Sequence, residues 1–286
     1  MRLRTLPLSL AGIVTGLAIS LTCGKLSASV VISLILTTVL LQILSNLSNE
    51  LGDTLKGTDT AERQGIRYSL QDGDMSIVEM KRLIAVTALL CCISGLAMIY
   101  FSFGTFLAAE PLLLILLGAA AIWAAMHYTL GKNPYGYRAK GDIFVFIFFG
   151  LVSVMGSAYV CTHELSPLWL LPGAAIGCWS VGVLNINNIR DMKTDAATRI
   201  TVAMKLGVKK ARIYQTLLIC TGWVLLVIFS VMTFRPALLW SYILILPFFA
   251  IHLKGVWTRT DRALDPMLPM LVISTFATSL LMLVFS

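Results

Sequence analysis

Long runs of apolar residues, separated by short polar segments, dominate this sequence. Nine runs can be delimited, at residues 8–23, 28–48, 82–101, 108–126, 142–161, 167–187, 213–232, 237–253 and 267–285. Each is close to the ~20 residues that a helix needs to cross the hydrocarbon core of a bilayer. Composition agrees, because 58% of the residues are apolar and 13% are charged, against about 45–50% and about 25% in soluble domains. We therefore predict an all-α integral membrane protein with nine transmembrane helices that form a single domain over residues 1–286.

The distribution of Lys and Arg predicts the orientation. If the N-terminus is cytoplasmic, the segments on that side hold 20 of the 22 basic residues, and only Lys25 and Arg235 fall outside. This asymmetry follows the positive-inside rule and predicts a multi-pass protein of the cell membrane. It also explains the net charge of +8 without nucleic acid as a partner. The first run lacks a convincing signal-peptidase site, so we expect it to be retained as a span.

The long polar segments all lie on the predicted cytoplasmic side, at residues 49–81, 127–141 and 188–212. That side also holds all but two of the 14 acidic residues. Any chemistry is therefore expected to face the cytoplasm. Ser76 and Glu79 form a capping-box pattern, which predicts that a helix starts there and leads into the third run.

Two clusters of acidic and amide side chains each follow an apolar run directly. They consist of Asn49, Asp53 and Asp59 after the second run and of Asn188, Asp191 and Asp195 after the sixth. Spacings of three and four residues place side chains on one face of a helix. Oxygen ligands suit Mg²⁺, which commonly bridges carboxylates to substrate phosphates, whereas neither cluster contains the His or Cys ligands typical of zinc or copper. We predict that the six residues bind Mg²⁺, with Mn²⁺ as the alternative ion, and that Asn49, Asp53, Asp191 and Asp195 are catalytic. The alternative is that these acids only solubilise loops or cap helices, but the repetition of the pattern disfavours it.

Cations accompany both clusters. Lys56, Arg63 and Arg67 follow the first, while Arg190 and Lys193 lie within the second. A diphosphate requires such cations, because carboxylate–metal bridges leave its outer oxygens uncompensated. We predict that these five residues bind diphosphate. The alternative for each is the positive-inside bias already described.

The segment at residues 127–141 combines aromatic and basic side chains, namely Tyr128, Lys132, Tyr135, Tyr137 and Arg138. Tyrosine rings can stack on a planar substrate while a Lys or Arg pairs with its carboxylate. These five residues are therefore predicted to bind an aromatic acid. The alternative is an aromatic belt at the membrane interface that contains a turn.

The paired acidic motifs on a chain of nine apolar runs resemble those of the UbiA-type intramembrane prenyltransferases. Three further stretches, Arg2-Leu3-Arg4-Thr5-Leu6-Pro7, residues 131–138 and residues 184–191, are similar to the branch of this family that acts in menaquinone synthesis. The resemblance implies that the spans surround a central cavity, open to lipid and closed by a polar cytoplasmic cap. It also implies Mg²⁺-dependent transfer of a polyprenyl group from polyprenyl diphosphate to 1,4-dihydroxy-2-naphthoate. Loss of CO₂ and diphosphate would then give demethylmenaquinone. The sequence departs from the family pattern at Glu50 and Asn188, where Asp is usual.

Two other functions stay open at this point. A related prenyltransferase would use another aromatic acceptor, such as 4-hydroxybenzoate. A cation transporter would carry charged residues near the middle of its spans, where functional ions bind. The acids of this chain instead lie at the ends of the runs. Prenyl chain length and oligomeric state are not determined by the sequence.

Overall fold

The structure is a computed structural model that describes residues 3–24, 26–57, 69–70 and 73–286. Its main helices are α1 (Leu6–Leu21), α2 (Ala28–Leu55), α3 (Ile77–Phe103), α4 (Ala109–His127), α5 (Gly141–Val145), α6 (Ser153–Thr162), α7 (Leu170–Arg190), α8 (Met192–Asp195), α9 (Val202–Met232), α10 (Pro236–Thr258) and α11 (Met267–Val284). Short helical segments are η1 (Leu3–Thr5), η2 (Tyr135–Tyr137), η4 (Pro167–Trp169), η5 (Asp261–Leu264) and the π-helix η3 (Phe146–Val152), which joins α5 to α6. The predicted all-α class is thus confirmed for the described residues.

Each predicted apolar run lies in a helix. Among the described residues, eight helical stretches are long and apolar enough to cross a membrane. One of them, Gly141–Thr162, is the continuous series of α5, η3 and α6. The first run forms α1, which has 16 residues and is shorter than these stretches.

Several helices extend beyond their apolar runs into the polar segments. The helix α2 continues to Leu55 and therefore carries Asn49 and Asp53 on its last turns. The helix α3 begins at Ile77 behind the predicted capping box, in which Ser76 and Glu79 each accept a hydrogen bond from the other's backbone N–H. This prediction is confirmed. The acidic motifs are thus carried on the ends of helices rather than on free loops.

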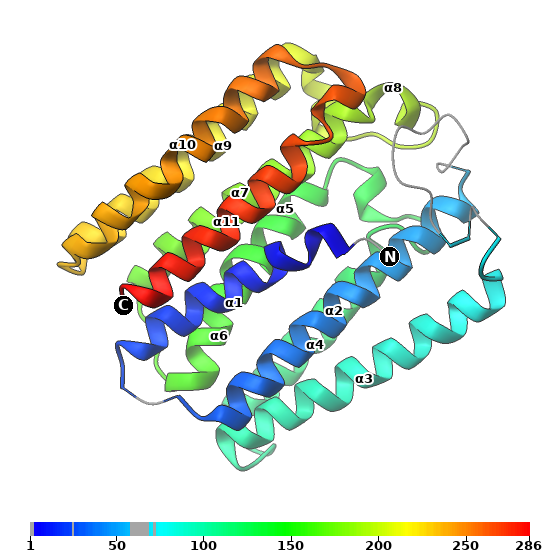
Figure 1. The fold of residues 1–286 in the computed structure, drawn as a ribbon. Coiled ribbons are helices and arrows are strands. Elements are labelled where there is room, and N and C mark those ends of the chain that lie inside the picture. Colours follow the sequence, from blue (N-terminus) through cyan, green and yellow to red (C-terminus); the bar gives the residue numbers. More distant parts are fainter. Residues whose placement is uncertain (1–2, 25, 58–68, 71–72) are drawn as a thin grey trace.

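The helix α7 is the most enclosed part of the bundle (Figure 1). In its most apolar window 67% of the residues are buried, against 11% in α4. Its neighbour η3 packs against it so closely that a Cβ added at Gly150 would lie 2.5 Å from the Cα of Gly177. Glycine at both positions permits this approach. The packing fixes α7, and with it the second acidic motif at its C-terminal end.

Candidate active site

The two acidic motifs meet at one end of the bundle, where α2 and α7 end (Figure 1). Arg199 lies between them. Its Nε donates to Asp195 Oδ2 at 2.7 Å, and its Nη1 lies 4.0 Å from Asp53 Oδ1. All three side chains are buried, with no more than 5% of any side chain exposed. Segments that are far apart in the sequence therefore share one buried charge cluster, as the paired motifs predicted.

Arg199 is a site residue that the sequence prediction missed. Burial opposes its charge, yet the carboxylates of Asp195 and Asp53 raise the pKa of the guanidinium above its ordinary value. The residue therefore stays charged and holds the two carboxylates together. A signal for it exists in the sequence, because Arg199 follows Asp195 by four residues, the spacing of neighbours on a helical turn.

The loop that contains η2 attaches to both motifs. The hydroxyl of Tyr137 donates to Asp53 Oδ1 at 2.7 Å, and Lys56 Nζ lies 4.5 Å from the centre of the Tyr137 ring. Two backbone hydrogen bonds, Ala139 N–H to Ile200 O at 2.8 Å and Ile200 N–H to Tyr137 O at 3.1 Å, join this loop to the segment after α8. Tyr137, which is predicted to contact an aromatic substrate, contacts Asp53 of the first motif in the structure. Burial lowers the pKa of Lys56, and Asp53 partly offsets that effect.

At the second motif, α7 ends at Arg190 and the single turn α8 follows Asp191. The guanidinium of Arg190 donates through Nε and Nη2 to both carboxylate oxygens of Asp191, each at 2.7 Å. Its Nη1 donates to Asp265 Oδ1 at 2.6 Å. Asp265 also accepts from Arg4 at 3.1 Å. The segment between α10 and α11 thus fixes the arginine that pairs with Asp191.

Lys193 occupies a different environment from Arg190. Its ammonium lies 3.0 Å from Asp261, and the two side chains are 80% and 41% exposed. Exposed pairs of this kind contribute little to stability, about 0–1 kcal/mol. Of the two cations predicted within the second motif, only Arg190 is buried among the acids.

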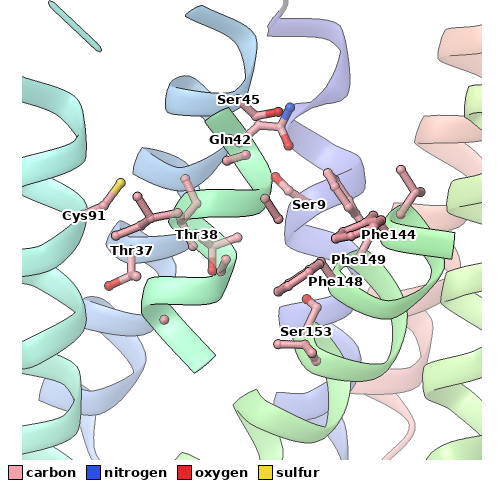
Figure 2. A pocket seen from close by; sticks show the side chains of 18 of the residues that line it. Ser9, Thr37, Thr38, Gln42, Ser45, Cys91, Phe144, Phe148, Phe149 and Ser153 are labelled. Carbon is pink, nitrogen blue, oxygen red and sulfur yellow. The ribbon is translucent and has the colours of Figure 1, made fainter. Parts of the chain in front are cut away.

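A cavity of about 490 Å³ extends from the acidic end into the bundle, and its lining is mainly apolar (Figure 2). Among the predicted site residues, Asn49, Asp53, Tyr128 and Tyr135 line it, and so does Arg199. The rings of Tyr135 and Phe144 stack with centroids 3.9 Å apart. Burial raises the pKa of Tyr135, so its hydroxyl stays neutral and donates to Ala124 O at 2.7 Å.

Other predicted residues lie away from the cavity lining. Asn188 is buried with 5% exposure, but the residue of this motif that lines the cavity is its neighbour Asn187. Lys132 and Arg138 are exposed, and the Arg138 guanidinium donates to Asn133 Oδ1. A further three predictions, Asp59, Arg63 and Arg67, fall outside the described residues.

The side chains at this end are of the kind that Mg²⁺ binds. The buried carboxylates of Asp53, Asp191 and Asp195 and the half-buried amide of Asn49 offer oxygen ligands, and hard cations prefer oxygen. Within the described part of the chain, no three His, Cys, Asp or Glu side chains already form a compact metal site. Two of these carboxylates are instead paired with arginines, Asp191 with Arg190 and Asp195 with Arg199.

Membrane-length helices around an apolar cavity that ends in buried carboxylates and arginines are suited to a substrate with an anionic head and an apolar tail. This architecture defines a class of intramembrane transferases. The sequence profile of the UbiA prenyltransferase family matches residues 9–279, and the chain belongs to that family. It is therefore a membrane-embedded prenyltransferase, as the motifs predicted.

Individual relatives agree in sequence and in fold. The chain is 38% identical over 283 residues to a 1,4-dihydroxy-2-naphthoate octaprenyltransferase from Escherichia coli (strain K12), covering 98% of this chain and 91% of that protein. The apo structure of a UbiA homolog from Aeropyrum pernix K1 superposes with a TM-score of 0.75 at 17% identity, covering 99% and 98% of the two chains. A UbiA homolog from Archaeoglobus fulgidus bound to DMAPP and Mg²⁺ gives a TM-score of 0.64 at 14% identity, again over 99% and 98%. At these identities the two structures establish the fold alone.

Proposed function

We propose that this chain transfers a polyprenyl group from polyprenyl diphosphate to 1,4-dihydroxy-2-naphthoate, with release of CO₂ and diphosphate, to give demethylmenaquinol, the reduced form of demethylmenaquinone. The observation that carries the proposal is the buried cluster of Asp53, Arg199 and Asp195 at the end of an apolar cavity. The 38% identity to a naphthoate octaprenyltransferase over nearly the whole chain supports the choice of acceptor.

The two ends of the donor substrate match the two parts of the site. The hydrocarbon tail lies in the apolar cavity, and the diphosphate lies at the acidic end. Asp53, Asp191, Asp195 and Asn49 hold Mg²⁺, with Asn188 and Asp59 as further ligands. When bound, Mg²⁺ compensates the negative charge that develops on the leaving diphosphate.

The cations of the cap act on the same diphosphate. Arg199 and Arg190 are buried and stay charged beside the carboxylates, so they are placed to pair with phosphate oxygens. Lys56, whose Nζ lies 4.5 Å from the centre of the Tyr137 ring, is assigned the same role, as are Lys193, Arg63 and Arg67. Together these groups favour the charge distribution in which the allylic C–O bond is broken.

The walls below the cap protect the reacting carbon. As the C–O bond breaks, its electron pair leaves with the diphosphate and an allylic cation forms. Tyr128, Tyr135 and Phe144 surround this part of the cavity and exclude water, which would otherwise capture the cation. The electron-rich ring of the acceptor then forms the new carbon–carbon bond, and the electron pair of its carbon–carboxylate bond returns to the ring as CO₂ leaves.

The proposed topology follows from the charges and helix lengths. Nine crossings with a cytoplasmic N-terminus place the acidic end on the cytoplasmic side of the cell membrane. The ninth crossing is α1, whose 16 residues span about 24 Å. This length approaches the ~30 Å of the hydrocarbon core, and η1 extends it.

The proposal is tested with purified protein, 1,4-dihydroxy-2-naphthoate and a labelled polyprenyl diphosphate. We expect a labelled demethylmenaquinol that no longer forms when EDTA is present and forms again when Mg²⁺ is restored. A product from 4-hydroxybenzoate in place of naphthoate would assign the chain to another acceptor. Turnover that is unaffected by EDTA would contradict the metal assignment.

A further inference from the structure

Gln42 lies on α2, deeper in the cavity than the first acidic motif. With Asn46, Asn49 and Asp53 it forms a polar face, at spacings of four, three and four residues, and all four side chains line the cavity. At 1.5 Å per residue, Gln42 is about 16 Å from Asp53 along the helix axis. Figure 2 shows Gln42 beside Ser45, in the same cavity as Ser9 and three phenylalanines. The residue therefore lies beyond the reach of the diphosphate head.

Among the described residues, the side-chain nitrogen of Gln42 has hydrogen-bond partners and its side-chain oxygen has none. Its Nε2 donates to Thr5 Oγ1 at 2.9 Å and to Asn46 Oδ1 at 3.2 Å, which uses both amide hydrogens. Its Oε1 is buried and accepts no hydrogen bond from any described residue. The whole residue is 6% exposed. A buried carbonyl oxygen without a donor is unfavourable, and because Gln42 lines the cavity, a turn of its side-chain amide would present Oε1 to a donor on a ligand.

The chemistry of the two substrates decides which ligand supplies that donor. A prenyl diphosphate has a hydrocarbon tail without donors and an ionised head that only accepts. The carboxylate of the naphthoate also only accepts. The ring hydroxyls of the acceptor are the groups that donate. Given the function proposed above, on which this step rests, we infer that Gln42 Oε1 accepts a hydrogen bond from a ring hydroxyl and that Gln42 determines specificity for the acceptor.

The aromatic wall of the cavity suits the same ligand. Phe144 and Phe148 line it from α5 and η3, with ring centroids 6.3 Å apart and ring planes 15° from parallel. The ring of Tyr135 also stacks on that of Phe144. A planar bicyclic ring packs on such a surface and leaves its hydroxyls at the edge. Stacking alone selects flat rings, so recognition of a hydroxylated ring requires a polar group such as Gln42.

The test compares acceptor analogues in the wild type and in Gln42→Leu. Inhibition constants are measured for 1,4-dihydroxy-2-naphthoate turnover with 1-hydroxy-2-naphthoate and 4-hydroxy-2-naphthoate, each of which lacks one hydroxyl. In the wild type, we expect one of these analogues to bind about 10-fold more weakly than the other. In Gln42→Leu this preference disappears, the KM of the naphthoate rises about 10-fold, and the KM of the polyprenyl diphosphate is unchanged.

Two control variants separate recognition from packing. Thr38 lines the cavity one turn further along α2, and its hydroxyl already donates to Leu34 O at 2.9 Å, so Thr38→Val should keep the hydroxyl preference. Thr5→Val removes a partner of Nε2 but leaves Oε1 in place, and should keep it too.

Two outcomes overturn the inference. One is that Gln42→Leu retains the wild-type preference between the analogues. The other needs no variant, namely that wild-type enzyme binds both analogues equally. Failure of the wild type to prenylate naphthoate at all is a separate result, and it would reject the proposed function instead.

Discussion

Arg199→Leu is the substitution for which the structure gives the largest expected effect outside the acidic motifs. It removes the cation that contacts Asp195 directly and lies 4.0 Å from Asp53. The side chains of Arg199 and Asp195 are 5% and 0% exposed, so water cannot replace the lost partner without a rearrangement. Breaking a buried pair of this kind costs about 3–5 kcal/mol. If the transition state loses about 3 kcal/mol of stabilisation relative to the free enzyme and substrate, kcat/KM for the polyprenyl diphosphate falls about 100-fold or more.

Arg199→Lys distinguishes the effect of the positive charge from the effect of the guanidinium geometry. A lysine keeps the positive charge, but its single ammonium cannot present the forked donors that contact Asp195 while also approaching Asp53. We expect an intermediate loss, about 10-fold in kcat/KM.

The assay is initial-rate turnover of purified variants, with thermal unfolding of the same samples to detect loss of the fold. Arg262→Leu is the matched control, because it removes the same charge from an exposed side chain at the same end of the bundle. Its kcat/KM should stay within about 2-fold of the wild type. Equal losses in Arg199→Leu and Arg262→Leu would refute the bridging role and leave only a general effect of charge.

Four other substitutions test neighbouring contacts. Asp53→Asn and Asp191→Asn should each abolish turnover in protein that still inserts and folds, and near-normal rates with Mg²⁺ present would remove these residues from the metal site. Asp265→Asn should raise the KM of the diphosphate substrate about 5-fold, because Arg190 loses a hydrogen-bond partner. Asp261→Asn loses only an exposed ion pair and should leave this KM unchanged. Equal KM values in the two variants would argue against a role for the Asp265 contact. Tyr137→Phe deletes one hydrogen bond to Asp53 and should lower kcat/KM about 2- to 10-fold, and an unchanged value would show that the bond does not position the carboxylate.

Helix positions could be predicted from the sequence because the apolar runs are a local signal. Their ends could not, since α2 and α9 extend into polar segments where hydropathy no longer marks a helix. The start of α3 was predictable from the Ser76–Glu79 capping box, which is also local. The π-helix η3 has no comparable signal, because its geometry depends on close packing against α7.

The acidic motifs could be predicted as one site, but their contacts could not. Asn187 and Asn188 differ by about 100° around the helix, and only packing decides which one faces the cavity. In the structure Ser180, Val183, Leu184 and Asn187 line the cavity together, at helical spacing. Pairs such as Arg190 with Asp265 are separated by 75 residues, so no local pattern reveals them.

Neither the helical scaffold nor the acidic end explains how this enzyme selects its acceptor. The helical scaffold is shared with the UbiA homolog from Aeropyrum pernix at 17% identity, so the fold by itself cannot encode the choice of aromatic ring. In the proposed function the acidic end binds the diphosphate, which is the same group whatever the acceptor. Selection must therefore come from side chains that line the cavity between that end and the apolar tail region. Gln42 is such a side chain, and its oxygen can be matched only by a ligand that donates a hydrogen bond.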